Sequence, residues 1–125
     1  MYAGTYVDDF RERRNAKKQL TQQAAIALAE QFVAEVIQNG LHVRRAILFG
    51  SYAKNEQHEL SDIDLALVAD EFENNRFENN RLIQDIKIKK PYFDIETHTY
   101  NTAYFERGDN GFIDEEIKPK GIVIL

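Results

Sequence analysis

The hydrophobic positions between residues 22 and 39 recur at steps of three and four residues, as they do on one face of a helix. The stripe consists of Ala25, Leu28, Ala29, Phe32 and Val36, and it is widened by Ile26, Val33 and Ile37. Thr21 precedes it and can accept a hydrogen bond from a free backbone N–H. Gly40 follows it, where a left-handed residue often ends a helix. The pattern predicts a core-facing helix over 22–39.

Four later segments have the pattern of strands. Residues 44–49 end in a continuous apolar run that stops at a Gly-Ser pair, which is typical of a buried strand entering a turn. Residues 63–68 form a second apolar run, residues 92–100 alternate and are rich in β-formers, and residues 122–125 are apolar. The polar stretch 70–90 lies between the second and third strands and is predicted to be helical. We expect an α/β fold, with one mixed sheet flanked by helices.

The beginning of the chain has a weaker pattern. Residues 7–19 are charged, with a thin stripe at Val7, Phe10, Arg14 and Leu20, which predicts a short helix or an ordered arm. We therefore divide the chain into an arm over 1–20 and a single domain over 21–125. The pentapeptide FENNR occurs at 72–76 and again at 77–81. It is interpreted as a tandem duplication in a solvated helix start or loop, with a mobile flap as the alternative.

Composition limits the class of protein. A chain of 125 residues with 43% hydrophobic and 30% charged residues is typical of one globular domain. The absence of cysteine excludes disulfides, thiolate metal sites and cysteine nucleophiles. The net charge of −5 argues against a general nucleic-acid binder. No apolar run approaches the ~18 residues of a membrane span, and the first residues do not resemble a signal peptide. We expect a cytoplasmic protein that does not bind a membrane.

Two aspartates form the first chemical signal. Asp62 and Asp64 lie two positions apart at the start of a predicted strand, so both carboxylates project from one face. Ionised carboxylates at this spacing repel each other unless a cation lies between them. Mg²⁺ takes oxygen ligands and is often held by one or two carboxylates together with substrate phosphates. The pair is a candidate metal site, although two solvated aspartates on a half-exposed strand are the simpler interpretation of this pattern alone.

The second signal is the turn after the first strand. Gly50 has no side chain to block a close ligand, Ser51 offers a hydroxyl, and the backbone N–H groups of a following helical turn can hold phosphate. Lys54 could add positive charge. Gly-Ser also marks many ordinary turns. Its combination with the Asp-x-Asp pair eleven residues later is much more specific, and it predicts a nucleotide-phosphate site at Gly50, Ser51 and Lys54.

The segments GSYAKN and SDIDLALV resemble the signature of the DNA polymerase β-like nucleotidyltransferase superfamily. They are most similar to the small prokaryotic minimal nucleotidyltransferase (MNT) group, whose members read LFGSxARG, then SDIDLxV, then a later strand with a third acid. The resemblance spans about residues 22–125. One departure is Asn55, which stands at the usual second glycine of the motif. Asn is the non-glycine residue that best tolerates left-handed geometry, but the change leaves a catalytically degenerate binding module as an alternative.

The resemblance implies two Mg²⁺ ions, or Mn²⁺, bridged by Asp62 and Asp64. A third acid would complete one metal site and help to deprotonate the acceptor. Asp94 is favoured because its Phe-Asp-Ile context matches the family pattern, and Glu96 is the alternative. His98 shares the face of both acids and is interpreted as a polar strand residue. The implied reaction is the transfer of AMP from ATP, with Gly50 and Ser51 holding the β- and γ-phosphates.

The resemblance also implies a partner. MNT proteins act as antitoxins of HEPN-type toxins, so a HEPN toxin is the expected protein substrate, modified on a tyrosine hydroxyl. A module that neutralises its partner by contact alone remains open. So does a transferase for a small molecule such as an antibiotic, which is disfavoured because the catalytic core consumes the chain. Self-association is possible.

Overall fold

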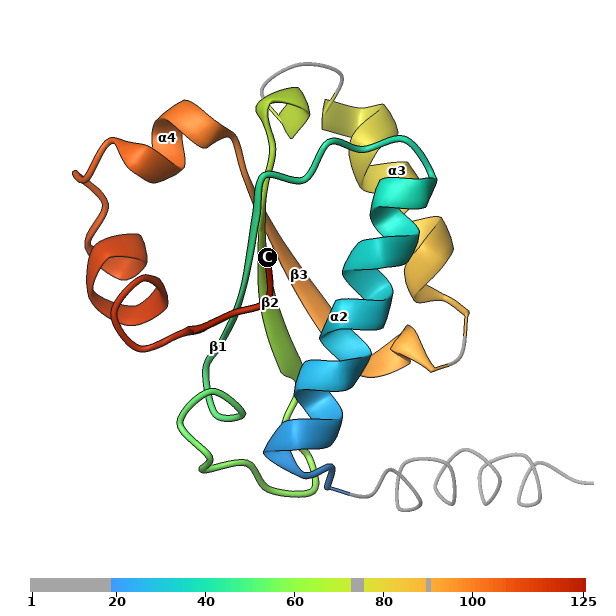
Figure 1. The fold of residues 1–125 in the computed structure, drawn as a ribbon, viewed down its shortest axis with the longest axis vertical. Coiled ribbons are helices and arrows are strands. Elements are labelled where there is room, and N and C mark those ends of the chain that lie inside the picture. Colours follow the sequence, from blue (N-terminus) through green and yellow to red (C-terminus); the bar gives the residue numbers. More distant parts are fainter. Residues whose placement is uncertain (1–18, 73–75, 90) are drawn as a thin grey trace, which may run out of the picture.

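The computed structural model describes residues 19–72, 76–89 and 91–125, and these form a four-stranded sheet with helices on both faces (Figure 1). The strands are β1 (Arg45–Phe49), β2 (Ile63–Val68), β3 (Ile95–Tyr100) and β4 (Ile122–Val123). Their order across the sheet is β3-β2-β1-β4. β1 is antiparallel to both β2 and β4, whereas β2 and β3 are parallel. The expected α/β fold with a mixed sheet is confirmed.

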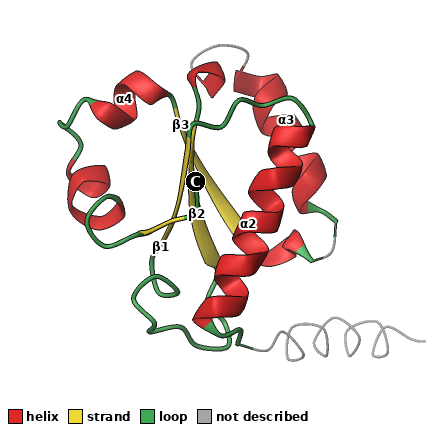
Figure 2. Ribbon diagram, in the orientation of Figure 1, coloured by secondary structure: helices red, strands yellow, loops and turns green. Residues whose placement is uncertain are grey.

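The helices form a layer on each side of the sheet (Figure 2). The α-helices are α2 (Gln22–Gln38), α3 (Arg76–Lys87) and α4 (Thr102–Glu106). Three shorter segments are the 3₁₀-helices η1 (Asp70–Phe72) and η2 (Tyr92–Asp94) and the π-helix η3 (Ile113–Ile117). α2 and α3 cover one face, while α4 and η3 cover the other. Thr21 caps α2 as expected, because its hydroxyl accepts a hydrogen bond from the Ala24 N–H at 3.0 Å.

Alternate residues of β2 pack into two separate hydrophobic cores. Leu65 and Leu67 pack with Phe32 of α2 and Ile83 of α3 in one of them. Ala66 and Val68 belong to the other core, together with Phe49, Phe105, Ile113 and Ile117. A strand that is buried on both faces reads as a continuous apolar run, which is why the sequence of β2 shows no alternation after Asp64. Asp64 lies on the face of β2 that carries Ala66.

The third strand is shorter than its sequence pattern suggested. The strand expected over 92–100 begins only at Ile95, because residues 92–94 form η2. The Ile95 N–H donates to the Tyr92 carbonyl, so this N–H closes a 3₁₀ turn. The first strand begins at Arg45 and the fourth ends at Val123, each slightly inside the expected limits.

Two other predicted segments lie largely or partly outside the residues that the structure describes. The helix or arm expected over 7–19 lies outside them, apart from its last residue. The repeated pentapeptide is divided between η1, where Phe72 is buried, and α3, which begins at Arg76. The polar stretch 70–90 is mainly helical where it is described. Among the described residues, no helix is both long enough and apolar enough to cross a membrane.

Candidate active site

Asp64 lies at the centre of a cluster of donor groups on β2 and β3. It pairs with Phe49 of β1 on one side and with Glu96 of β3 on the other. Because residues two apart on a strand share a face, His98 projects from the same face of β3 as Glu96. One ligand atom from each of Asp64, Glu96 and His98 lies within 4.8 Å of the others. This is the one group of three or more such donors among the described residues, and it could hold a metal ion.

The imidazole of His98 is held between an aromatic ring and a carboxylate. Its ring meets the Phe49 ring edge-on, with centroids 4.9 Å apart and an interplanar angle of 67°. Its Nε2 atom lies 3.4 Å from Asp64 Oδ1. That nitrogen is buried, and no hydrogen-bond partner is found for it in the described part of the chain. The ring therefore lies beside the Asp64 carboxylate with its Nε2 atom making no hydrogen bond among the described residues.

The Gly-Ser turn lies against Asp64. Gly50 has a φ of +77°, a conformation that side-chain-bearing residues rarely adopt. A Cβ atom at Gly50 would lie 2.5 Å from Asp64 Oδ2, so a larger residue would displace the carboxylate. The turn continues with hydrogen bonds from the Lys54 N–H to the Gly50 carbonyl and from the Glu56 N–H to the Ser51 carbonyl. Gly50 is thus brought against Asp64, and Ser51 is the next residue of the same turn.

Asn55 occupies a left-handed conformation within this turn, with a φ of 57°. It is the one described non-glycine residue with a positive φ. The backbone therefore keeps the shape that a glycine would give it. Its side chain also accepts a hydrogen bond from the Gln57 amide at 3.2 Å. The replacement of the second motif glycine by asparagine leaves the turn geometry intact.

Hydrogen bonds link the turn to the start of α2. Tyr52 is 2% exposed, and its hydroxyl accepts a hydrogen bond from the Leu20 N–H at 3.2 Å. The Gln22 amide donates to the carbonyls of Tyr52 and Ala53 at 3.0 and 3.2 Å. These bonds link the turn to a helix that is packed on the sheet, so the position of Ser51 is fixed by the fold.

Lys54 directs its charge toward η3. Its Nζ atom lies 3.9 Å from Glu116 Oε2, and Lys120 reaches the same oxygen at 3.0 Å. The hydrogen bond from Lys120, together with the charges of Lys120 and Lys54, holds the pKa of Glu116 below its ordinary value. Lys54 remains at the edge of the site, 41% exposed, with Glu116 as its nearest acid among the described residues.

Asp62 and Asp94 lie outside the donor cluster, each two residues before the cluster acid of its own segment. Asp62 is exposed and directly precedes β2, while Asp94 is half-buried and ends η2 immediately before β3. The first paired residues of the two strands are Ile63 and Ile95, so the four acids form an outer pair and an inner pair. The donor cluster contains the inner pair, Asp64 and Glu96, but neither Asp62 nor Asp94. The sequence pattern did not assign His98 to this site. The signal that could have done so is its two-residue spacing from Glu96, which places both side chains on one face of the strand.

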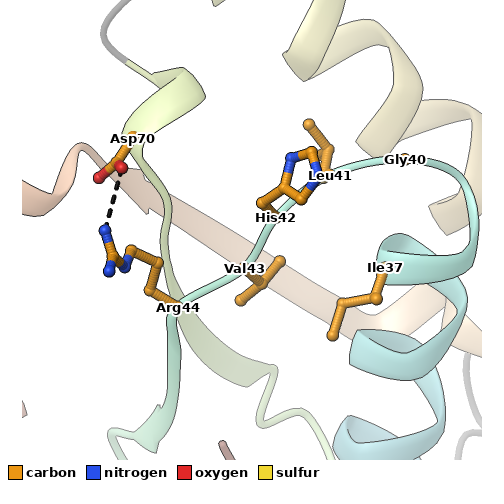
Figure 3. A pocket seen from close by; sticks show the side chains of 7 residues that line it. All are labelled: Ile37, Gly40, Leu41, His42, Val43, Arg44 and Asp70. Atoms are coloured by element: carbon orange, nitrogen blue, oxygen red, sulfur yellow. Dashed lines mark hydrogen bonds and ion pairs between the residues drawn. The ribbon is translucent and has the colours of Figure 1, made fainter.

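Two pockets in the described part of the chain lie away from the acids. One, of about 700 Å³, is at the opposite end of β1, where Arg44 and Asp70 form an ion pair of 3.0 Å (Figure 3). Its other lining residues are Ile37, Gly40, Leu41, His42 and Val43. A second, of about 500 Å³, borders the start of α2 and reaches Asn55 and Gln57. Neither pocket includes a member of the donor cluster.

Comparisons with known proteins identify the family and the fold. The family model described as polymerase beta nucleotidyltransferase matches residues 31–124. A crystal structure of a candidate nucleotidyltransferase from Sulfolobus solfataricus is similar to the chain with a TM-score of 0.59 and 20% sequence identity. The similarity covers 82% of this chain and 80% of that one, and at this identity it shows the fold. No curated protein matches the chain significantly.

Proposed function

The chain belongs to the polymerase beta nucleotidyltransferase family, and from this premise we propose that it transfers AMP from Mg-ATP to a hydroxyl group of a partner protein. The observation that supports this most directly is the position of the Gly50-Ser51 turn against Asp64, with Glu96 beside it. A phosphate-binding turn and a pair of carboxylates then face the same small region. This is the arrangement that phosphoryl transfer requires, since its catalysis depends mainly on positioning and charge neutralisation.

The donor set fits a divalent cation. Asp64 and Glu96 supply carboxylate oxygens from adjacent strands, and exposed Asp62 lies two positions before Asp64. We assign the third acid of the metal site to Glu96, because the strand register places it beside Asp64. When bound, divalent cations neutralise phosphate charge and align the attacking and leaving oxygens.

The remaining roles belong to the turn and to Asp94. Gly50 leaves room for the triphosphate, and the Ser51 hydroxyl donates to one of its oxygens. The acceptor oxygen forms a bond to the α-phosphorus, the bond from that phosphorus to the bridging oxygen breaks, and pyrophosphate leaves with the bonding electrons. The hydroxyl proton passes to Asp94, which lies directly before β3 and outside the donor cluster. General bases of this kind contribute roughly 10²–10⁴-fold to rate.

The acceptor is proposed to be a protein that brings its own binding surface. Asp62 and Glu96 are exposed and Asp64 is half-buried, so a docked macromolecule can reach these acids. The net charge of −5 favours a partner with a basic surface. Together with the motif resemblance, this supports a HEPN-type toxin modified on a tyrosine, in which case the chain acts as an antitoxin. The left-handed Asn55 supports retained activity over a degenerate module, because the turn is preserved.

The test is to incubate the protein with Mg-ATP and a HEPN-type toxin, and to weigh the toxin by mass spectrometry. We expect a gain of one or more AMP units, which is lost with Asp64→Asn. Asp109→Asn is a matched control, because Asp109 is an exposed aspartate paired with Arg107. Tight binding and neutralisation without a mass change would support the contact-only module. Failure to bind would instead favour a small-molecule acceptor.

A further inference from the structure

We propose that His98 is a metal ligand, and that Asp64, Glu96 and His98 together bind Mn²⁺ more tightly than Mg²⁺. This inference rests on the proposed function only because both assign Asp64 and Glu96 to the metal site. The inference concerns which cation the site selects. It assigns to His98 a direct role that neither the motif nor the family match gives it.

The distances suit one ion. Zinc bonds to imidazole nitrogen and carboxylate oxygen are about 2.0–2.2 Å long, so two donors on one ion of similar size lie no more than about 4.4 Å apart. The three donors already lie within 4.8 Å of one another, and His98 Nε2 is 3.4 Å from Asp64 Oδ1. Small side-chain adjustments therefore bring all three onto a single cation.

The His98 ring is held in place before any ligand binds. The edge-on contact with Phe49 fixes one side of it. Its register partner on β2 is Ala66, whose methyl group leaves room for the ring to lean toward Asp64. Phe49 is itself 5% exposed and contacts Phe112 with ring centroids 5.6 Å apart. A donor that is held this firmly loses little conformational entropy on binding a metal.

His98 Nε2 lacks another partner. This nitrogen is buried, and among the described residues it makes no hydrogen bond, although a carboxylate oxygen lies 3.4 Å away. Buried polar atoms are usually hydrogen-bonded, and an exception calls for an explanation such as a bound ion. A metal ion held by this nitrogen together with the Asp64 and Glu96 carboxylates provides that explanation.

The chemistry of the donor atoms determines which cation the site prefers. Mg²⁺ takes oxygen ligands in a near-ideal octahedron. Imidazole suits Zn, Cu, Fe and Ni, whereas Mn²⁺ shares the preference of Mg²⁺ for carboxylates and, as a transition metal, also accepts a nitrogen ligand. A site with two carboxylates and one imidazole therefore favours Mn²⁺, and by the same argument Co²⁺ or Zn²⁺, over Mg²⁺. Replacing the nitrogen by an oxygen donor should remove most of that preference.

The experiment titrates the full chain with MnCl₂ and with MgCl₂, without nucleotide or partner, by calorimetry. We expect Mn²⁺ to bind at least about tenfold more tightly than Mg²⁺. His98→Asn should weaken Mn²⁺ binding at least about tenfold and change Mg²⁺ binding little. His42→Asn is the control, because His42 is a histidine at the opposite end of β1 with an 88% exposed side chain.

Pulsed electron paramagnetic resonance of the Mn²⁺-bound wild type supplies a readout that needs no variant. A nitrogen coupling to Mn²⁺ is expected, which His98→Asn abolishes and His42→Asn retains. Equal affinities for the two cations, an equal loss of both in His98→Asn, or the absence of nitrogen coupling would overturn the proposal. A Mn²⁺ preference with no AMP transfer would count against the proposed function alone. AMP transfer with no Mn²⁺ preference would count against this inference alone.

Discussion

Gly50 and Asp64 lie so close across β1 and β2 that a Cβ atom on Gly50 would come within 2.5 Å of the Asp64 carboxylate. The Gly50-Ser51 turn and the inner aspartate are therefore packed against each other. Gly50 also has a φ of +77°. Two separate physical constraints, backbone conformation and side-chain space, thus select glycine at the same position.

Gly50→Ala should lower both stability and activity. The left-handed conformation alone costs an alanine roughly 1–2 kcal/mol, and the methyl group must also displace Asp64. We expect a loss of transfer activity of about 10²-fold, since a 1 Å misplacement of a reacting group can cost that much. Urea unfolding and a transfer assay measure the two effects.

Gly108→Ala provides the matched control for this prediction. Gly108 has a φ of +81°, but a Cβ atom there would meet nothing within 4 Å. It should show a similar loss of unfolding free energy with activity unchanged. Equal activity in the two variants would mean that the contact with Asp64 does not position the carboxylate.

Asn55→Gly should keep the transferase active and change stability by less than ~0.5 kcal/mol. Glycine adopts the φ of 57° without strain, although it gains entropy in the unfolded chain. Asn55→Ala should cost about 1 kcal/mol, because alanine lacks the tolerance of asparagine for this conformation. Unfolding midpoints of the three proteins test this order. If Asn55→Gly were much more active than wild type, the asparagine would be impairing the site.

The sequence predicted those features of the fold that depend on local patterns. The Thr21 cap, the amphipathic stripe of α2 and the Gly50 turn each follow from a few neighbouring residues, and each is found where the pattern placed it. The register between β2 and β3 is different, because residues about thirty positions apart determine it. That register sets Glu96 beside Asp64, which the local Phe-Asp-Ile context of Asp94 could not indicate. The proximity of His98 to Asp64 depends on the same non-local pairing.

Stability should fall at acid pH partly through Glu71. Burial raises the pKa of Glu71, but hydrogen bonds, chiefly from the His42 N–H at 2.7 Å and also from the His42 ring, outweigh it and hold the pKa below 4.5. A carboxyl whose pKa is depressed on folding stabilises the protein fully above its unfolded pKa. That contribution is lost as the pH falls through the lower, folded value.

Glu71→Gln tests this contribution. The variant should be less stable than wild type at pH 7, by about 1 kcal/mol or less for a partly exposed pair. The difference should shrink as the pH is lowered below about 4.5, the usual value for this carboxyl. Urea unfolding at several pH values measures it. A difference that stays constant with pH would mean that Glu71 acts by packing and not by charge.

Variants of Glu96 and Asp94, the two candidates for the third acid, should lose different properties. Glu96 belongs to the donor cluster, so Glu96→Gln should weaken divalent cation binding at least about tenfold and lower activity with it. Asp94 lies outside the cluster, so Asp94→Asn should keep the cation affinity and lower the rate by roughly 10²-fold or more, as expected for a general base. Calorimetric titration and a transfer assay on the same preparations distinguish the two losses. If Asp94→Asn lost the metal and Glu96→Gln kept it, the roles would be exchanged, and the assignment based on the FDI motif would stand over the one based on the strand register.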